Sequence, residues 1–125
     1  MMTVFYVGLG GAIGAIGRFG IGVMLKSVAV TGFPWATLSV NILGSLAMGL
    51  VMGWLSRVGG QEGLRLFLAV GVLGGFTTFS AFSMELFGLL ERRDAVLAVL
   101  YASSSLIGGV AAFCLGYALL RSVLA

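Results

Sequence analysis

"GGFTTFSAFSME", residues 74–85, lies in the middle of an apolar segment and decides how the chain folds. It holds two adjacent glycines, four hydroxyl side chains, three phenylalanines and one carboxylate. Glycine and threonine are poor helix formers, and threonine hydroxyls compete with the backbone for hydrogen bonds. Backbone groups freed inside a bilayer are tolerated only where protein buries them or where they line a cavity. The stretch therefore predicts a functional break at Gly74-Gly75 and Thr77-Thr78, or a glycine kink that serves packing.

The composition around this stretch is that of an integral membrane protein. The chain has 125 residues, of which 60% are hydrophobic and 9% charged, and its mean hydropathy is +1.17. A soluble domain of this size cannot bury so much apolar surface. We expect an all-α integral membrane fold, one transmembrane domain over residues 1–125, whose third helix is broken in mid-membrane. A crossing takes about 20 residues, and four segments qualify: about 3–25, 35–56, 65–90 and 95–120.

The residue types exclude several kinds of chemistry. The chain has no histidine, and its single cysteine, Cys114, lies in the last span, where we interpret it as a structural thiol. The net charge of +3 is spread over span ends and turns, so it does not indicate a nucleic-acid partner. No nucleophile–base pair or cluster of metal-ligating side chains is visible, which disfavours an enzyme.

The positive charges are divided almost evenly between the two sides of the membrane. With four spans, one side carries three basic residues and the other three or four: Arg57, Arg65 and Arg121 against Lys26, Arg92, Arg93 and, if it reaches outward, Arg18. An excess of Lys and Arg on one side normally fixes the orientation. Its near absence favours insertion in both orientations, and so an antiparallel homodimer, over one orientation set by a marginal bias.

Small residues recur every fourth position in the first span. Gly10 and Gly14 allow close approach of another helix, which is the plain interpretation of this stripe. Arg18 continues the stripe about one turn inside the predicted helix end. Its side chain either extends outward to water or serves an anion in a vestibule.

Polar side chains at the same spacing mark the second and fourth spans. Thr37, Asn41 and Ser45 follow one another at intervals of four, and Tyr101 and Ser105 do the same. Asn41 either supplies a packing hydrogen bond, or it lines a polar track with Thr37. Hydroxyls in a membrane helix often bond to carbonyls of their own helix. Among the span-four residues we expect Tyr101 and Ser105 to be the functional pair.

Phe79 and Phe82 lie three residues apart and share one helical face directly after the predicted break. Phenylalanines in a membrane usually contact lipid, but these two stand among hydroxyls instead of leucines. An aromatic ring has an electropositive edge. Such edges, with neutral donors, could solvate a small anion weakly enough to release it, as conduction requires.

Three blocks of the chain closely resemble the signature of the CrcB/Fluc fluoride channels: GGFTTFSAFSME, TLSVNILGS (37–45) and GGAIGAIGRF (10–19). The resemblance covers essentially the whole chain. It implies a passive, highly selective channel that exports fluoride across a bacterial inner membrane. It also implies a dual-topology antiparallel homodimer with two fluoride pathways, and one central structural sodium ion (Na+) bound by the carbonyls of Gly74 and Thr77.

The resemblance also implies roles for single residues. Phe79 and Phe82 match the paired pore phenylalanines, and Asn41 matches the pore asparagine. Arg18 matches the vestibule arginine and Glu85 the carboxylate of the third span. Further hydroxyls near the ion path are matched by Thr37, Ser80, Ser83, Tyr101 and Ser105.

Two positions depart from the family pattern. Ala81 stands where a threonine is usual, between the two phenylalanines. Gly109 stands one turn beyond Ser105, where members of the family can carry a further hydroxyl. The outer end of the polar track therefore lacks that group on the fourth span.

Two other classes of protein share part of this pattern. Small multidrug-type cation exporters have about this length, four helices and dual topology. They use a carboxylate in the first span, where this chain has Arg18, and its only intramembrane carboxylate is Glu85. A non-conducting assembly protein needs packing faces only, and would not need Asn41, Tyr101 and a broken third span together.

Overall fold

The structure, a computed structural model, describes residues 1–59 and 61–123, without the side chains of residues 28–30. All regular structure within these ranges is helical. Four spans are long and apolar enough to cross a membrane: α1 (Met2–Met24), α2 (Trp35–Val58), the third span (Glu62–Glu91) and α6 (Ala95–Val123). The prediction of four spans is confirmed, with ends within a few residues of those expected. Gly60, in the expected 57–64 connection, lies outside the described residues.

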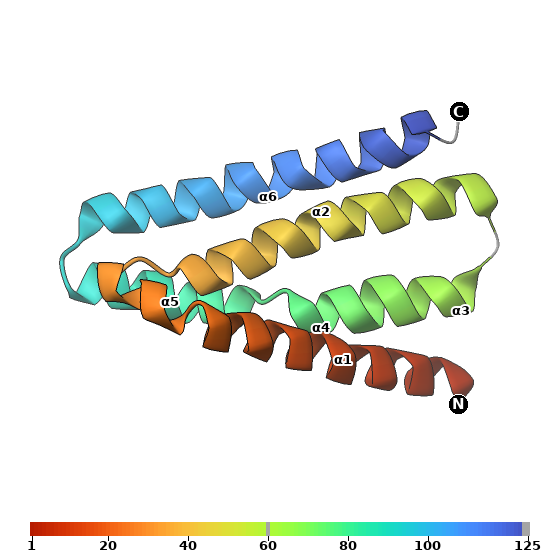
Figure 1. Cartoon of the computed structure of the whole chain (residues 1–125), viewed down its shortest axis with the longest axis horizontal. Helices are drawn as coiled ribbons and strands as arrows, with labels where there is room; N and C mark the ends of the chain where they lie inside the picture. Colours follow the sequence, from red (N-terminus) through yellow and green to blue (C-terminus); the bar gives the residue numbers. More distant parts are fainter. Residues whose placement is uncertain (60, 124–125) are drawn as a thin grey trace.

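The spans form a slender bundle, and both chain ends lie at the same end of it (Figure 1). Helix α2 packs along α6, while α1 packs along the third span. A short 3-10 helix, η1 (Lys26–Thr31), connects α1 to α2 at the opposite end. At the end shared by the termini, the Arg57 guanidinium donates a hydrogen bond to the Arg121 carbonyl at 2.8 Å. This contact ties the end of α2 to the end of α6.

The third span is not one regular helix. Gly74 keeps helical angles (φ −64°, ψ −37°), whereas Thr77 (φ −76°, ψ 157°) and Thr78 (φ −150°, ψ 117°) are extended. The helical angles therefore stop at the two threonines, within the predicted stretch but after its two glycines. The span consists of four helical pieces: α3 (Glu62–Arg65), η2 (Leu66–Leu73), α4 (Gly74–Phe76) and α5 (Phe79–Glu91).

Close backbone packing explains the second of the two glycines. A side chain at Gly75 would bring its Cβ to 2.5 Å from the Gly11 carbonyl oxygen, so only a glycine allows α4 to approach α1 there. Threonine hydroxyls, in contrast, can replace the helical partners of nearby backbone groups. Gly75 thus serves packing, and the threonines carry the change of direction.

The segment η2 is a π-helix, which the sequence did not predict. In a π-helix each N–H donates to the carbonyl five residues back, and such wide turns are often found at functional sites. The wide turns of η2 lie against the glycine face of α1. A Cβ at Gly10 would lie 2.5 Å from the Phe67 carbonyl oxygen and 2.9 Å from the Val72 nitrogen. The predicted packing role of Gly10 is confirmed.

The turn between α5 and α6 contains a residue in the left-handed region. Arg93 has φ 59°, and its N–H donates to the Leu90 carbonyl at 2.9 Å. The Asp94 N–H donates to the Leu89 carbonyl at 3.0 Å, which ends α5 in the manner of a Schellman motif. The Asp94 carboxylate then accepts from the Leu97 N–H at 3.2 Å and caps α6.

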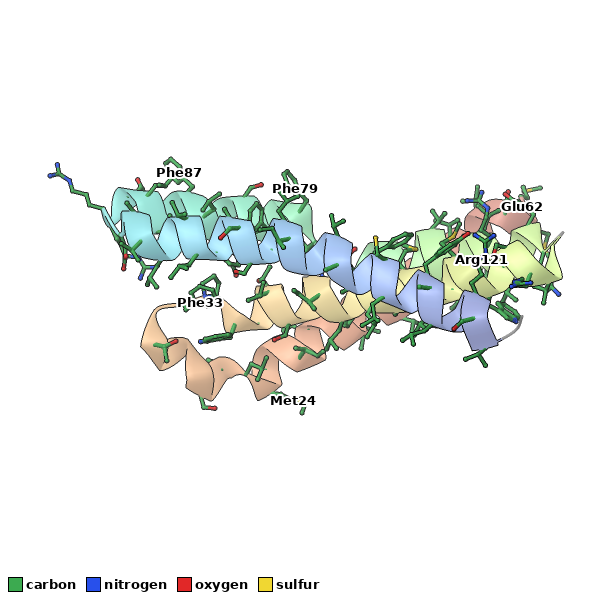
Figure 2. All side chains as sticks on the ribbon, turned by 90° about the horizontal axis from the view of Figure 1, so that it is seen from above. Met24, Phe33, Glu62, Phe79, Phe87 and Arg121 are labelled. Carbon is green, nitrogen blue, oxygen red and sulfur yellow. The ribbon has the colours of Figure 1, made fainter. Side chains whose placement is uncertain are left out.

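Few side chains are buried within the described chain. Tyr101, Leu89 and Val40 are the largest that are fully buried. Large apolar side chains are exposed along all four spans, and Phe79 and Phe87 project from the same side of α5 (Figure 2). This apolar exterior suits contact with lipid or with a second chain.

Candidate functional site

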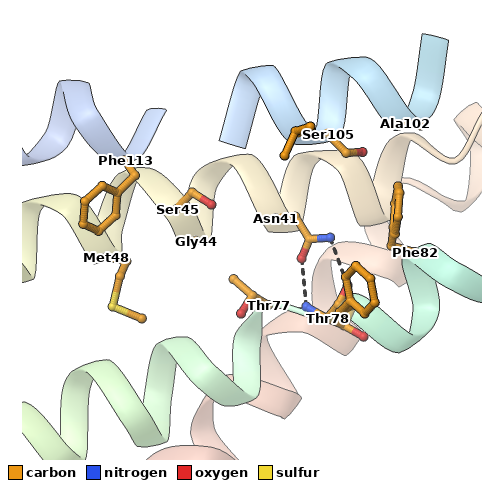
Figure 3. Close-up of a pocket in the computed structure, with 12 residues that line it drawn as sticks. Asn41, Gly44, Ser45, Met48, Thr77, Thr78, Phe82, Ala102, Ser105 and Phe113 are labelled. Carbon is orange, nitrogen blue, oxygen red and sulfur yellow. Dashed lines mark hydrogen bonds between the residues drawn. The ribbon is translucent and has the colours of Figure 1, made fainter. Parts of the chain in front are cut away.

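The Asn41 side chain bridges α2 to the interruption in the third span. Its amide nitrogen donates to the Thr78 carbonyl at 3.0 Å, and its oxygen accepts from the Thr78 N–H at 2.8 Å (Figure 3). Thr78 is only 8% exposed, so these two backbone groups have little access to bulk water. Asn41 therefore satisfies both polar backbone groups of one extended residue, as a neighbouring β-strand would.

Two carbonyls lose their helical donors because of this arrangement. In a continuous helix the Thr78 N–H would donate to the Gly74 carbonyl, but it donates to Asn41 instead. The Ala81 N–H, the corresponding donor for the Thr77 carbonyl, donates to the Thr78 hydroxyl at 3.2 Å. Neither carbonyl accepts a hydrogen bond from another residue in the described part of the chain. Both oxygens are thus available to a hard cation.

A cavity of about 380 Å³ lies beside the interruption and collects four of the predicted pathway residues. Asn41, Phe79, Phe82 and Ser105 all line it (Figure 3). The two phenyl rings are tilted by 35° with their centroids 5.6 Å apart. The rings therefore border a space that also contains an amide and a hydroxyl.

Ser105 has an unusual hydroxyl. Its oxygen is buried but has no hydrogen-bond partner in the described chain. A buried polar group without a partner costs about 1–3 kcal/mol. A water molecule or an anion in the cavity would remove this cost.

The Glu85 carboxylate is held by two hydroxyl groups from two other helices. Thr37 on α2 donates to one of its oxygens at 2.7 Å, and Tyr101 on α6 donates to the other at 2.6 Å. Tyr101 is fully buried and stacks on Phe82 with a centroid distance of 5.0 Å. The sequence analysis placed Thr37 and Tyr101 on the ion path without linking them to Glu85. The structure shows them as its hydrogen-bond donors.

Arg18 lines a second cavity, of about 420 Å³, together with Thr37 and Glu85. Its Nε atom is buried and has no hydrogen-bond partner among the described residues. The Nε atom of this arginine therefore lies in the wall of the cavity and away from water. The cavity holds both a guanidinium and a carboxylate.

Besides Tyr101, which binds Glu85, two predicted pathway hydroxyls line neither of these cavities. The Ser83 hydroxyl is exposed and donates to the carbonyl of Phe79 in its own helix at 3.0 Å. Ser80 is also exposed, and its hydroxyl lies 3.2 Å from that of Thr78. Within the described chain, the structure therefore separates these two serines from the cavity that Ser105 lines.

Thr78 is a site residue that the sequence analysis missed. Its hydroxyl caps α5 by accepting from the Ala81 N–H, and its backbone groups bind Asn41. A threonine directly before a helix is a known capping signal and could have identified this role. No comparable signal exists for the contacts of Glu85, because its partners come from helices far apart in the sequence.

Comparison with known proteins gives consistent results over almost the whole chain. The family model described as "CrcB-like protein, Camphor Resistance (CrcB)" matches residues 5–117. A protein of Novosphingobium aromaticivorans is 49% identical over 98% of this chain and 99% of its own length. A protein of Sphingopyxis alaskensis is 51% identical over 98% of both chains, and one of Thermus thermophilus is 50% identical over 95% of both. All three bear the name "Fluoride-specific ion channel FluC".

Proposed function

This chain belongs to the CrcB family, and from that premise we propose that it is a passive channel selective for fluoride. The observation that carries the proposal is the cavity where Phe79 and Phe82 meet Asn41 and Ser105. The relatives named as fluoride-specific channels match this chain from end to end. Its four apolar spans agree with a multi-pass protein of a bacterial membrane.

The lining of this cavity suits a small, strongly hydrated anion. Fluoride loses much of its water shell in a narrow path and needs donors in exchange. The Ser105 hydroxyl and the edges of the two phenyl rings supply partial positive charge without a formal cation. A full positive charge would hold the ion too tightly, whereas weak sites admit it and release it.

The membrane potential suffices to drive export. Hydrogen fluoride crosses membranes as a neutral acid and dissociates in a near-neutral cytosol, which traps the anion inside. At 100 mV, inside negative, each outgoing charge gains about 2.3 kcal/mol, which corresponds to a concentration ratio of roughly 50. Neither a proton relay nor a nucleotide is needed for this transport.

We further propose that two copies assemble in antiparallel orientation and form two pathways. Three observations support this assembly. Phe79 is 79% exposed although it lines the cavity, so a second chain could cover it. The basic residues are balanced between the two ends, which allows both orientations. The apolar exterior is extensive around Phe79 and Phe87.

A structural sodium ion at the centre of that dimer is a further part of the proposal. The carbonyls of Gly74 and Thr77 fit this role because each has lost its helical donor. Backbone carbonyls at helix breaks coordinate Na+ in membrane transporters. Gly74 is exposed in the single chain, so the same groups of a second copy could approach the ion.

The test is fluoride efflux from liposomes that contain the purified protein and a potassium ionophore. We expect rapid fluoride efflux and no chloride efflux above that of empty liposomes. Phe82→Ile should lower fluoride efflux strongly and leave the assembly intact on size-exclusion chromatography. Equal efflux of both halides would refute the selectivity, and unchanged efflux in the Phe82 variant would refute the role of the ring edges.

A further inference from the structure

The cavity beside Asn41 does not end at Ser105. It continues along the contact between α2 and α6, where Gly44, Ser45, Met48 and Phe113 line it (Figure 3). Most of this extension is apolar. Ser45 and Thr77 carry hydroxyls here, and the Thr77 hydroxyl already donates to the Leu73 carbonyl at 2.9 Å.

The Ser45 hydroxyl is free to bind a ligand. Serines in membrane helices usually donate to a carbonyl of the preceding turn, as Ser103 does to the Val99 carbonyl at 2.6 Å. Ser45 makes no such bond, and its hydroxyl has no partner in the described parts of the chain. The cavity therefore contains two unpartnered hydroxyls, those of Ser45 on α2 and Ser105 on α6.

At the level of Ser45, α6 carries Gly109, which has no side chain. A Cβ built on Gly109 would lie 3.5 Å from the Ser45 Oγ, which is ordinary van der Waals contact. Gly109 thus faces Ser45 across the two helices, with room for a small side chain. Position 109 of α6 therefore offers no hydroxyl to the cavity, and the hydroxyl at this level is that of Ser45 on α2.

We propose that Ser45 is a further fluoride-binding residue of the pathway, which it extends beyond Ser105 along the α2–α6 contact. The role rests on the proposed channel function. A fluoride ion that leaves the phenyl rings and Ser105 finds its next hydroxyl at Ser45. Like the others, this donor is neutral, so it binds the ion without trapping it. Beyond it the cavity is bordered by Met48 and Phe113.

The first test compares two serine-to-alanine variants of α2 in the liposome efflux assay. Ser45→Ala should lower fluoride efflux about tenfold, which corresponds to the loss of one hydrogen bond to a charged group. Ser39→Ala is the matched control: Ser39 is also half-buried and unbonded in the described chain, but it lines neither this cavity nor the one beside Arg18. Its efflux should equal that of the wild type. Wild-type efflux in Ser45→Ala would overturn the proposal.

The second test moves the hydroxyl to the facing helix. The double variant Ser45→Ala with Gly109→Ser places a hydroxyl at nearly the same point from α6, and efflux should return to within about threefold of the wild type. Ser45→Thr keeps the hydroxyl in place and should also remain within that range. If both hydroxyl-bearing variants fold, as judged by size-exclusion chromatography, but conduct no better than Ser45→Ala, the hydroxyl is not the cause and the proposal is refuted. Absence of fluoride efflux in the wild type would instead refute the channel function itself.

Discussion

Replacement of Asn41 is the sharpest test of how the interrupted span is held together. Asn41→Leu keeps the volume of the side chain but removes both hydrogen bonds to Thr78. Interhelical hydrogen bonds in membranes are worth about 0.6 kcal/mol on average and up to about 1.7 kcal/mol. Two such bonds therefore predict a loss of about 1–3 kcal/mol in the free energy of unfolding. Because Thr78 is 8% exposed, few waters can reach the lost partners, and we expect the upper half of that range.

Asn41→Asp separates the two bonds. The aspartate can still accept from the Thr78 N–H, but it presents an acceptor to the Thr78 carbonyl, where the amide now donates. We expect an ionised aspartate here to cost at least as much stability as Asn41→Leu, and a protonated one to cost less. Reversible unfolding in mixed detergent micelles measures both variants against the wild type.

Leu43→Ala is the control, because Leu43 lies two residues further along α2 with an exposed side chain. It should change the free energy of unfolding by less than about 0.5 kcal/mol. If Asn41→Leu were as stable as this control, the two hydrogen bonds would contribute nothing to the fold, and the reasoning would be wrong.

Three further predictions concern other parts of the molecule. Gly49→Ala should prevent close packing of α2 on α6, since its Cβ would meet the Phe113 carbonyl, and we expect a loss of several kcal/mol or no folded protein in an expression and gel-filtration screen. Glu85→Gln should retain most fluoride efflux, because an amide oxygen still accepts from one of the two hydroxyl donors; complete loss would favour a proton-coupled exporter. Arg93→Gly should raise the free energy of unfolding by about 1 kcal/mol, because φ is 59° there; an unchanged or lower value would contradict a strained turn.

The sequence predicts the architecture well because hydropathy and helix length determine it. Long apolar segments place the four spans to within a few residues, and the glycine spacing predicts the contacts of α1. The position of the interruption is predicted less well. Glycine has two uses, flexibility and close approach, and spacing alone does not show that Gly75 serves the second.

The candidate site is only partly predictable for a different reason. Helical spacing places Phe79 and Phe82 on one face of α5. Once α5 is known to lie beside α2, a cavity shared with Asn41 is expected. Glu85 receives its hydrogen bonds from residues 48 positions earlier and 16 positions later in the chain. Such contacts depend on how three helices rotate about their axes, and local sequence does not encode that rotation. The π-helical turns of η2 also depend on packing against another helix, so local sequence does not predict them.

The two donors of Glu85 have a consequence for biosynthesis. Thr37 belongs to a helix that leaves the ribosome before Glu85, whereas Tyr101 belongs to a helix made after it. During translation the carboxylate therefore enters the lipid with one donor already inserted and the other still to come. Until α6 arrives, the carboxylate therefore has at most one of its two hydroxyl donors, so completion of α6 is also the moment at which its second oxygen gains a hydrogen bond.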